Sequence, residues 1–370
     1  MNTVPAPRPR VLALFSEVQA NGGIQRFNRT LLAAFAELGV DCDVLSLHGA
    51  GAAGCAGNRV RFALAAAARL ATRRYDWLLV GHVNFLATAV VLRGLAGLKP
   101  PRVMLAAHGI EVWSGIHAGR RWALGRTDRI LCVSRYTRDR LLEQAPRLDP
   151  VRLMRFPNAL AETWRGVTAA APRESLPPRF VLSVTRLARG DRYKGLVSVI
   201  EALGMVDDAE LHYVIVGSGE DRAFLERVAR RCGVASRVHF RPGAADAELA
   251  GMYRQCHAFV LPSGNEGFGI VYLEAMYFGA PVIAAAAKGA LDVVTDGETG
   301  LLAAFADTVA IAAAIDRLAA DPALRARLCA AGRAAVSADG EFTFRRFVAR
   351  SARALGIATA DATEPDATER

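Results

Sequence analysis

Two glutamates, Glu266 and Glu274, stand on either side of a glycine-containing segment, Gly267-Phe268-Gly269. An apolar run precedes this segment and residues with helical spacing follow it, so the pattern predicts a turn between a buried strand and a helix. Backbone N–H groups at the start of a helix suit a phosphate. A carboxylate two turns further on is better placed to accept hydrogen bonds from sugar hydroxyls. The spacing therefore predicts a site for a nucleotide sugar.

The elements that must position these residues alternate between strand-like and helix-like runs along the whole chain. The first half has strand-like runs at 10–15, 42–47, 77–80, 103–106, 130–133 and 151–155. A Pro-, Ala- and Arg-containing stretch without period, 157–178, is typical of a linker. A second series follows, with strand-like runs at 180–184, 211–216, 237–240 and 257–261. The alternation predicts α/β domains with parallel sheets, repeated once.

Length and composition set limits on the kind of protein. A chain of 370 residues with 52% hydrophobic and 22% charged residues is expected to form two domains, each with its own core. Its six cysteines include no C-x-x-C pair, which favours a reducing compartment over a zinc ribbon. We see no signal peptide and no apolar stretch long enough to span a bilayer, so we expect a cytoplasmic protein.

The net charge of +10 is consistent with nucleic acid, an anionic membrane or phosphorylated small molecules as partners. Nucleic acid is disfavoured because no aromatic residues interleave with the basic ones. Arginines at 59, 61, 69, 73 and 74 surround an Ala/Leu-rich run, 62–71. Such a helix could lie on an anionic membrane surface, although packing of its alanines on a sheet is the more common arrangement.

The chain resembles glycosyltransferase family 4 in the frame around the two glutamates. The shared pattern is LPS at 261–263, EGFG at 266–269, LEAM at 273–276 and GAPVIA at 279–284. The resemblance extends more weakly over nearly the whole chain. It implies retaining enzymes of the GT-B fold, in which two Rossmann-like domains face a central cleft and a nucleotide-activated sugar is the donor. It also implies domains at 1–165 and 166–340, a helix at 341–357 that crosses back to the first domain, and a disordered tail at 358–370.

The resemblance also implies roles for individual residues. Arg186 and Lys194 match a basic pair that holds the diphosphate, and such fixed cations stabilise the leaving group. Glu274 would bind the ribose, with Glu266 on the donor sugar. From the first domain, His108 would reach the reacting sugar, and the loop Gly22-Gly23 would face the diphosphate and the acceptor.

One position departs from the family pattern. Lys288-Gly289 stands where many members have Gly-Gly, which affects donor contacts there.

These features predict a retaining hexosyltransferase that needs neither a metal nor a cofactor besides its UDP- or GDP-sugar donor. The acceptor is expected to be a glycan or a polyprenyl-linked sugar of exopolysaccharide, lipopolysaccharide or cell-envelope synthesis, with peripheral contact at the inner face of the membrane. A sugar-nucleotide epimerase and a catalytically silent binding partner remain alternatives. An NAD-linked oxidoreductase is disfavoured, because Arg222 replaces the third glycine of the fingerprint that begins at Gly217 and Gly219.

Overall fold

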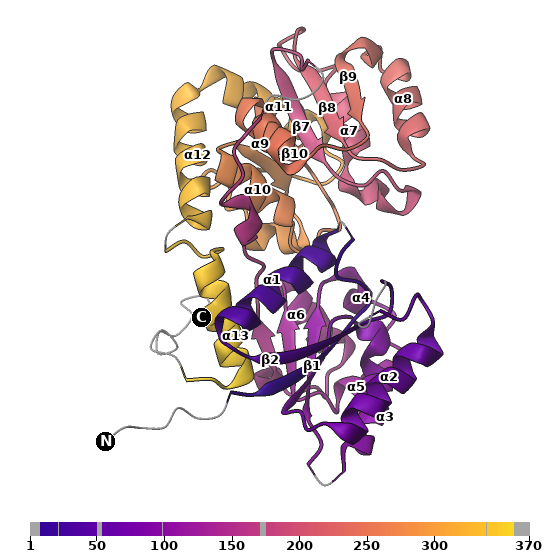
Figure 1. The fold of residues 1–370 in the computed structure, drawn as a ribbon. Helices are drawn as coiled ribbons and strands as arrows, with labels where there is room; N and C mark the ends of the chain where they lie inside the picture. The colour runs from indigo at the N-terminus through magenta and orange to yellow at the C-terminus, as the bar shows by residue number, and fades with distance from the viewer. Residues whose placement is uncertain are drawn as a thin grey trace, which may run out of the picture. The chain divides into compact units, whose positions relative to one another are not determined.

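The computed structural model describes residues 8–20, 22–49, 54–97, 99–170, 175–337 and 339–358. The chain divides into two compact units, which are Met1–Ala159 together with Phe344–Arg370, and Leu160–Thr343. Each unit contains a six-stranded sheet whose strand pairs are all parallel (Figure 1). The tail expected at 358–370 lies outside the described residues except for Ala358.

The sheet of the first unit has the order β2-β1-β3-β4-β5-β6. Side chains alternate along its strands: Leu12 and Leu14 belong to the core cluster on one face, whereas Val11, Ala13 and Phe15 are buried outside that cluster. Both faces are therefore covered, as a parallel sheet requires. The strands are β1 (Arg10–Phe15), β2 (Asp41–Ser46), β3 (Trp77–Val80), β4 (Arg102–Ala107), β5 (Arg129–Cys132) and β6 (Leu153–Arg155).

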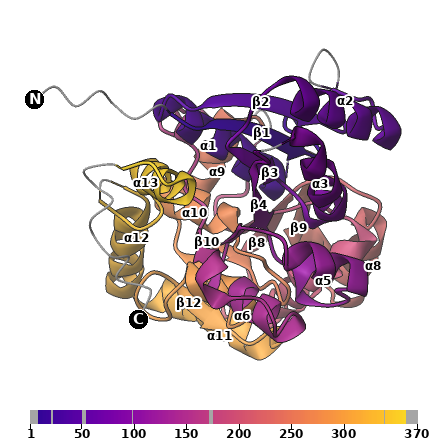
Figure 2. The same cartoon turned by 90° about the horizontal axis from the view of Figure 1, so that it is seen from below.

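Two helices from opposite ends of the chain, α1 (Gly23–Glu37) and α13 (Phe344–Leu355), lie side by side in Figure 1. The ring of Phe347 is 5.8 Å from that of Phe27, and Trp77 Nε1 donates to the carbonyl of Leu355 at 3.2 Å. The core cluster that contains Leu12 and Leu14 has its helical residues on five other helices. These are α2 (Arg59–Thr72), α3 (Leu86–Arg93), α4 (Ile110–Trp113), α5 (Ala118–Leu124) and α6 (Arg135–Gln144). The helix α3 contacts both α2 and α5, and the three follow one another in the order α2, α3, α5 in Figure 2.

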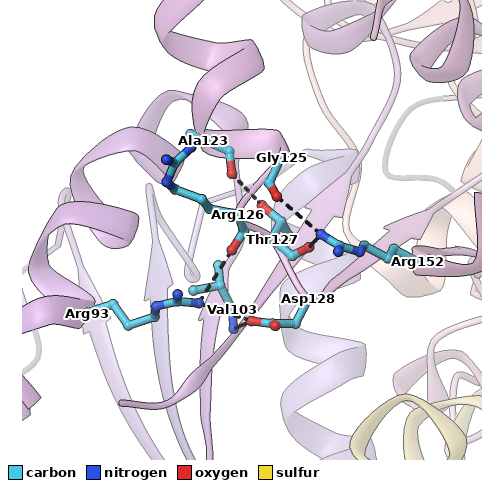
Figure 3. A network of polar contacts seen from close by, with 8 residues as sticks. All are labelled: Arg93, Val103, Ala123, Gly125, Arg126, Thr127, Asp128 and Arg152. Carbon is cyan, nitrogen blue, oxygen red and sulfur yellow. Dashed lines mark hydrogen bonds and ion pairs between the residues drawn. The ribbon is translucent and has the colours of Figure 1, made fainter. Parts of the chain in front are cut away.

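A polar network holds the turn between α5 and β5 (Figure 3). Asp128 Oδ2 accepts the backbone N–H of Val103 at 2.7 Å and pairs with Arg93 of α3 at 3.3 Å. Thr127 Oγ1 donates to the carbonyl of Ala123 at 3.0 Å, and Arg152 donates to the carbonyl of Thr127 at 3.3 Å. These contacts fasten the amino-terminal edge of the first sheet.

The second sheet has the order β12-β11-β10-β7-β8-β9. Its first strand, β7, lies in the middle, with β8 on one side and the later strand β10 on the other. Strand order therefore reverses between β7 and β10, and open α/β sheets bind ligands at such a point, outside the carboxyl ends of the strands. The strands are β7 (Phe180–Val184), β8 (His212–Val216), β9 (Val238–Arg241), β10 (Ala258–Leu261), β11 (Val282–Ala285) and β12 (Leu301–Ala303).

The helices of the second unit pack in two groups. One consists of α7 (Leu196–Ala202), α8 (Arg222–Arg231) and α11 (Thr308–Ala320), in which α7 contacts both others. The other consists of α9 (Asp246–Gln255), α10 (Ile270–Phe278) and α12 (Pro322–Val336), in which α10 contacts both others.

The expected linker, 157–178, differs from the structure in its described part. Its Trp164 is buried and its ring lies 5.3 Å from that of Phe278, while Ala170 donates its N–H to the carbonyl of Ala247 at 2.9 Å. The second unit therefore begins at Leu160, whereas we expected residue 166. The described part of the stretch is anchored by Leu160, Trp164 and the backbone of Ala170, which have no helical or strand spacing, so its pattern resembles that of a linker.

Candidate functional site

Three predicted site residues lie in loops at the carboxyl edge of the second sheet. Arg186 and Lys194 follow β7, and Glu266 follows β10. Because β7 and β10 are adjacent and parallel, the loops that follow them leave the sheet at the same edge and at the switch point. This edge is our candidate donor site.

Lys194 and Glu266 form an ion pair at the centre of that edge. Lys194 Nζ lies 2.6 Å from Glu266 Oε2, and the two side chains are only 17% and 14% exposed. Burial opposes the charge on Lys194, but the attraction and hydrogen bond of Glu266 outweigh it and raise the pKa of the lysine. The site thus holds a charged ammonium beside a carboxylate before any ligand binds.

Glycine allows the two loops to approach each other. Gly195 has a φ of +79°, and a Cβ at this position would lie 2.5 Å from the carbonyl oxygen of Pro262. In the same contact, Gly264 donates its N–H to the carbonyl of Tyr193 at 2.8 Å. The residue after Lys194 therefore has to be glycine for Lys194 to reach Glu266.

Arg186 is oriented by a buried aspartate. Its Nε and one terminal nitrogen both lie 2.8 Å from Asp191 Oδ2, while 75% of the arginine side chain remains exposed. Tyr193 donates to the other oxygen of Asp191 at 3.2 Å. Hydrogen bonding to Asp191 raises the pKa of Arg186.

The sequence reasoning did not single out Asp191. Its one signal was an acidic residue in an otherwise basic segment, and only the structure shows that it is buried. The neighbouring Arg192 forms two hydrogen bonds to Asp221, at 2.8 and 2.7 Å, which fasten this segment to the start of α8.

The glycine-containing turn leads into α10 as predicted from the pattern. Gly269 is the N-cap residue, with a φ of +93° and no side chain to occupy the first-turn N–H groups. The ring of Phe268 is buried and packs 5.7 Å from that of Phe342, so only the backbone of Phe268 remains for a ligand. A helix start of this kind suits a phosphate.

The departure at Lys288-Gly289 lies against the same turn. Gly289 donates its N–H to the carbonyl of Glu266 at 3.1 Å, and a Cβ on Gly289 would lie 2.1 Å from the carbonyl oxygen of Gly267. Lys288 has a φ of +53° and donates from Nζ to the side-chain oxygen of Asn265. The loop after β11 therefore supports the turn that carries Glu266.

Glu274 lies on α10 and is 1% exposed. Its Oε2 accepts a hydrogen bond from the hydroxyl of Tyr253, on α9, at 3.1 Å. A contact between Glu274 and a ribose stays a prediction.

The loop after β8 contributes close packing. Gly217 and Gly219 have φ values of +150° and +153°, and a Cβ on them would lie 1.8 Å from the carbonyl oxygen of Thr185 and 2.2 Å from that of Leu187. Both glycines therefore serve to pack the loop against the segment that contains Arg186. The two glycines that make this loop resemble a dinucleotide fingerprint are therefore explained by its packing.

His108, in the first unit, follows β4 and is largely enclosed. Its Nε2 lies 2.9 Å from the carbonyl oxygen of Gly81, and its ring meets that of Phe27 edge-on at 4.9 Å. Burial lowers the pKa of His108. Because a carbonyl oxygen only accepts, we assign the proton to Nε2, which leaves Nδ1 of the neutral ring as an acceptor.

Gly22 and Gly23 form the start of α1, after the loop that follows β1. A Cβ on Gly23 would meet no atom within 4 Å. Arg29 holds the preceding loop by donating to the carbonyls of Val18 and Ala20 at 2.7 and 3.0 Å. Asn21, which links this loop to Gly22, lies outside the described residues. The backbone of Gly23 is therefore open to a ligand.

The basic helix α2 buries Phe62, Ala66 and Leu70 in the core of the first unit. The inner face of α2 therefore packs on the sheet, which is the more common of the two expected arrangements. In the part of the chain that the structure describes, no helix has the length and apolarity to cross a bilayer. The same residues contain no group of three or more His, Cys, Asp or Glu side chains placed to hold a metal ion.

Comparison with known proteins places this geometry in a family. The family model for glycosyl transferases group 1 matches residues 169–335, and that for Glycosyltransferase Family 4 matches residues 21–161. The chain is 34% identical over 252 residues to a GDP-mannose-dependent alpha-(1-6)-phosphatidylinositol monomannoside mannosyltransferase of Mycolicibacterium smegmatis, a match that covers 63% of this chain and 64% of that protein. It is 45% identical over 122 residues to a D-inositol 3-phosphate glycosyltransferase of Frankia alni, covering 32% and 30%. The chain thus spans less than two thirds of the length of these relatives.

Solved structures show the same fold at low identity. The UDP complex of HepE from Anabaena has a TM-score of 0.74 and 18% identity, covering 94% of this chain and 99% of that one. Sucrose-phosphate synthase from Thermosynechococcus elongatus has a TM-score of 0.75 and 22% identity, covering 93% and 98%. Together with the two parallel sheets, these likenesses confirm the expected fold, GT-B with two Rossmann-like domains.

Proposed function

Because the chain belongs to glycosyltransferase family 4 of the group 1 glycosyl transferases, we propose that it transfers a hexose from a UDP- or GDP-sugar to a glycan or polyprenyl-linked acceptor. The observation that carries this proposal is the carboxyl edge of β7 and β10, whose loops offer the buried pair of Lys194 with Glu266 and the exposed guanidinium of Arg186. Such an edge suits a ligand that combines a diphosphate with sugar hydroxyls.

In this proposal the diphosphate is held by Arg186, Lys194 and the backbone N–H groups of Gly267–Gly269. Negative charge grows on the leaving diphosphate as its bond to the sugar breaks, and preorganised cations and dipoles stabilise that charge. Asp191 fixes the guanidinium of Arg186, so the cation need not reorganise when the charge develops. The protein's own cations thereby neutralise the phosphate, without a metal.

Glu266 then accepts hydrogen bonds from hydroxyls of the donor sugar, while Lys194 turns from Glu266 toward the diphosphate. We place Glu274 on the ribose. In the first domain, neutral His108 presents Nδ1 as an acceptor for a sugar hydroxyl, and the loop of Gly22 and Gly23, whose backbone is open at Gly23, contacts the diphosphate and the acceptor.

Retention follows from a same-face substitution in this proposal. The bond between the anomeric carbon and the diphosphate oxygen breaks, a bond to the acceptor oxygen forms on the same face, and the acceptor proton passes to the departing diphosphate. A double displacement would need a carboxylate nucleophile. Glu266, the only carboxylate that we place at the sugar, accepts hydrogen bonds from its hydroxyls in this proposal and is not assigned as a nucleophile.

The relatives narrow the candidate donors and acceptors. One is named for GDP-mannose, and others are named for inositol-containing acceptors. We therefore include GDP-mannose and inositol phosphates beside UDP-sugars and polyprenyl-linked glycans. Synthesis of exopolysaccharide, lipopolysaccharide or another cell-envelope glycan is the proposed context, in the cytoplasm at the inner face of the membrane.

The exposed face of α2 supports the proposed membrane contact. Val60 and Leu64 are 67% and 66% exposed there, next to Arg59 and Arg61. A surface that combines apolar and basic side chains suits an anionic bilayer.

A thermal-shift panel of UDP- and GDP-sugars is the first test, since a ligand that binds only the folded state raises the melting temperature. We expect one donor series to stabilise the wild-type protein and to lose its effect in the Lys194→Ala variant. The stabilising donor is then incubated alone and with lipid extract, and the product anomer is identified by NMR. Transfer with retention supports the proposal. An epimerised free sugar, an inverted product, or binding without any reaction would each contradict the proposed retaining transfer.

A further inference from the structure

A basic hollow lies at the edge of the second unit opposite the candidate donor site. Its volume is about 560 Å³, and its lining includes Arg165, Arg254 and Arg333 together with Tyr277, Phe278 and Ser337. The helix α10 begins at the candidate donor site and ends at this hollow, because its C-cap residue Gly279 also belongs to the lining. The two sites are therefore at opposite ends of one helix.

The hollow gathers positive charge without a matching carboxylate. None of its described lining residues is acidic. Arg165 pairs at 3.2 Å with Glu162, which lies outside the lining. Arg254 and Arg333 form no ion pair with any described carboxylate. Like charges held together in this way repel one another until an anion binds.

Helix capping does not account for the arrangement. Arg254 and Arg333 stand in the last turns of α9 and α12, where a cation is favourable for the helix dipole. However, neither forms a hydrogen bond to a described carbonyl group, so their N–H donors are available. The dipole also gives no reason for Arg165, which comes from a separate segment, to join them.

The backbone and the aromatic floor hold two of the guanidinium groups over the hollow. Gly279 has a φ of +83°, and a Cβ there would lie 2.2 Å from a terminal nitrogen of Arg333. Arg254 lies with its guanidinium carbon 5.7 Å from the ring centroid of Phe278, which Trp164 supports from another side at 5.3 Å. Planar guanidinium groups held in this way match the oxygens of a phosphate group in pairs.

We propose that this arginine pocket binds a phosphate group, carried either by a soluble phosphate ester or by a phospholipid headgroup. The proposal is independent of the donor site, because the pocket shares none of its residues with Arg186, Lys194 or Glu266.

The test compares a parent protein that carries Lys194→Ala with the double variant, which also carries Arg254→Gln and Arg333→Gln, in inorganic phosphate against sodium chloride of equal ionic strength. All proteins carry Lys194→Ala, so that phosphate binding at the candidate donor site contributes little to the change in melting temperature. We expect phosphate to raise the melting temperature of the parent protein, and its affinity to fall about tenfold or more in the double variant, because charge-assisted hydrogen bonds are lost. In chloride the double variant should melt no lower than the parent, since repulsion is relieved.

Arg231→Gln is the matched control, because Arg231 is an exposed arginine in the last turn of α8 and lies outside the pocket. It should leave the phosphate effect unchanged. Co-sedimentation with phosphatidylcholine vesicles, with and without phosphatidylglycerol, separates the two sources. Binding to the anionic vesicles that the double variant loses identifies a headgroup, and phosphate binding alone identifies a soluble ester. Equal phosphate affinity and equal vesicle binding in the parent and the double variant would overturn the proposal.

Discussion

Lys194 Nζ and Glu266 Oε2 lie 2.6 Å apart although 72 residues separate them in the chain. The pair joins the loop after β7 to the loop after β10, at the point where strand order reverses. Each residue therefore has two tasks, to hold its partner and to receive the ligand, and variants must separate stability from binding.

Removing either partner should cost both stability and activity. Lys194→Ala leaves the mostly buried carboxylate of Glu266 without its cation, and we expect a loss of about 1–3 kcal/mol in the free energy of unfolding. The kcat/KM for the donor should also fall about tenfold or more, because the diphosphate loses a fixed cation. Urea unfolding and initial-rate kinetics measure the two effects.

The double variant Lys194→Met/Glu266→Gln tells them apart. It removes both charges, so it should recover much of the stability but none of the activity. Near-wild-type transfer by this variant would show that the pair is structural only.

Asp191 is expected to act through Arg186. Asp191→Asn removes the charge that orients the guanidinium, so the KM for the donor should rise while the fold persists. Tyr193→Phe is the matched control, because it removes the other hydrogen bond to Asp191 without touching Arg186. If both variants have the same KM, then Asp191 does not position Arg186 for the donor.

Gly23→Ala separates folding from function at the first loop. A Cβ at Gly23 meets nothing within 4 Å, and alanine favours a helix over glycine, so the melting temperature should stay the same or rise slightly. If the backbone there contacts the substrates, the added methyl group should lower kcat/KM about tenfold. Unchanged kinetics would remove Gly22 and Gly23 from the site.

Acid should destabilise the second unit through a histidine pair. His212 Nδ1 and His239 Nε2 are 2.9 Å apart on neighbouring strands, and burial together with the charge of His212 lowers the pKa of His239. The folded state then binds fewer protons than the unfolded state near the ordinary histidine pKa, so stability is lost as the pH falls. We expect the free energy of unfolding to decrease from about pH 7 to about pH 5.

Either His239→Gln or His212→Gln should flatten that decrease, since each abolishes the pair. The remaining slope belongs to His82, His108 and His257, whose pKa values burial also lowers. Chemical denaturation across this pH range measures the slope. An unchanged slope in both variants would contradict the assignment.

The sequence by itself determined the class of fold and the family. Apolar runs, glycine turns and the two glutamates around Gly267-Phe268-Gly269 are local signals, and each survives without knowledge of the neighbouring strands. They were sufficient to predict two parallel α/β domains and membership of glycosyltransferase family 4, both of which are confirmed. They also nominated Arg186, Lys194, Glu266 and His108, whose roles stay predictions.

Only the tertiary structure decided which of these residues touch. The ion pair of Lys194 with Glu266 depends on the insertion of β10 beside β7, and no local pattern encodes that order. Burial of Asp191 beneath Arg186 and the docking of Trp164 on Phe278 likewise depend on which surfaces meet. The arginine pocket draws on residues 165, 254 and 333, which come together because the ends of α9, α10 and α12 lie beside the segment that begins the second unit. Contacts between distant segments follow from sheet order and packing, and a single sequence read along its length does not contain that information.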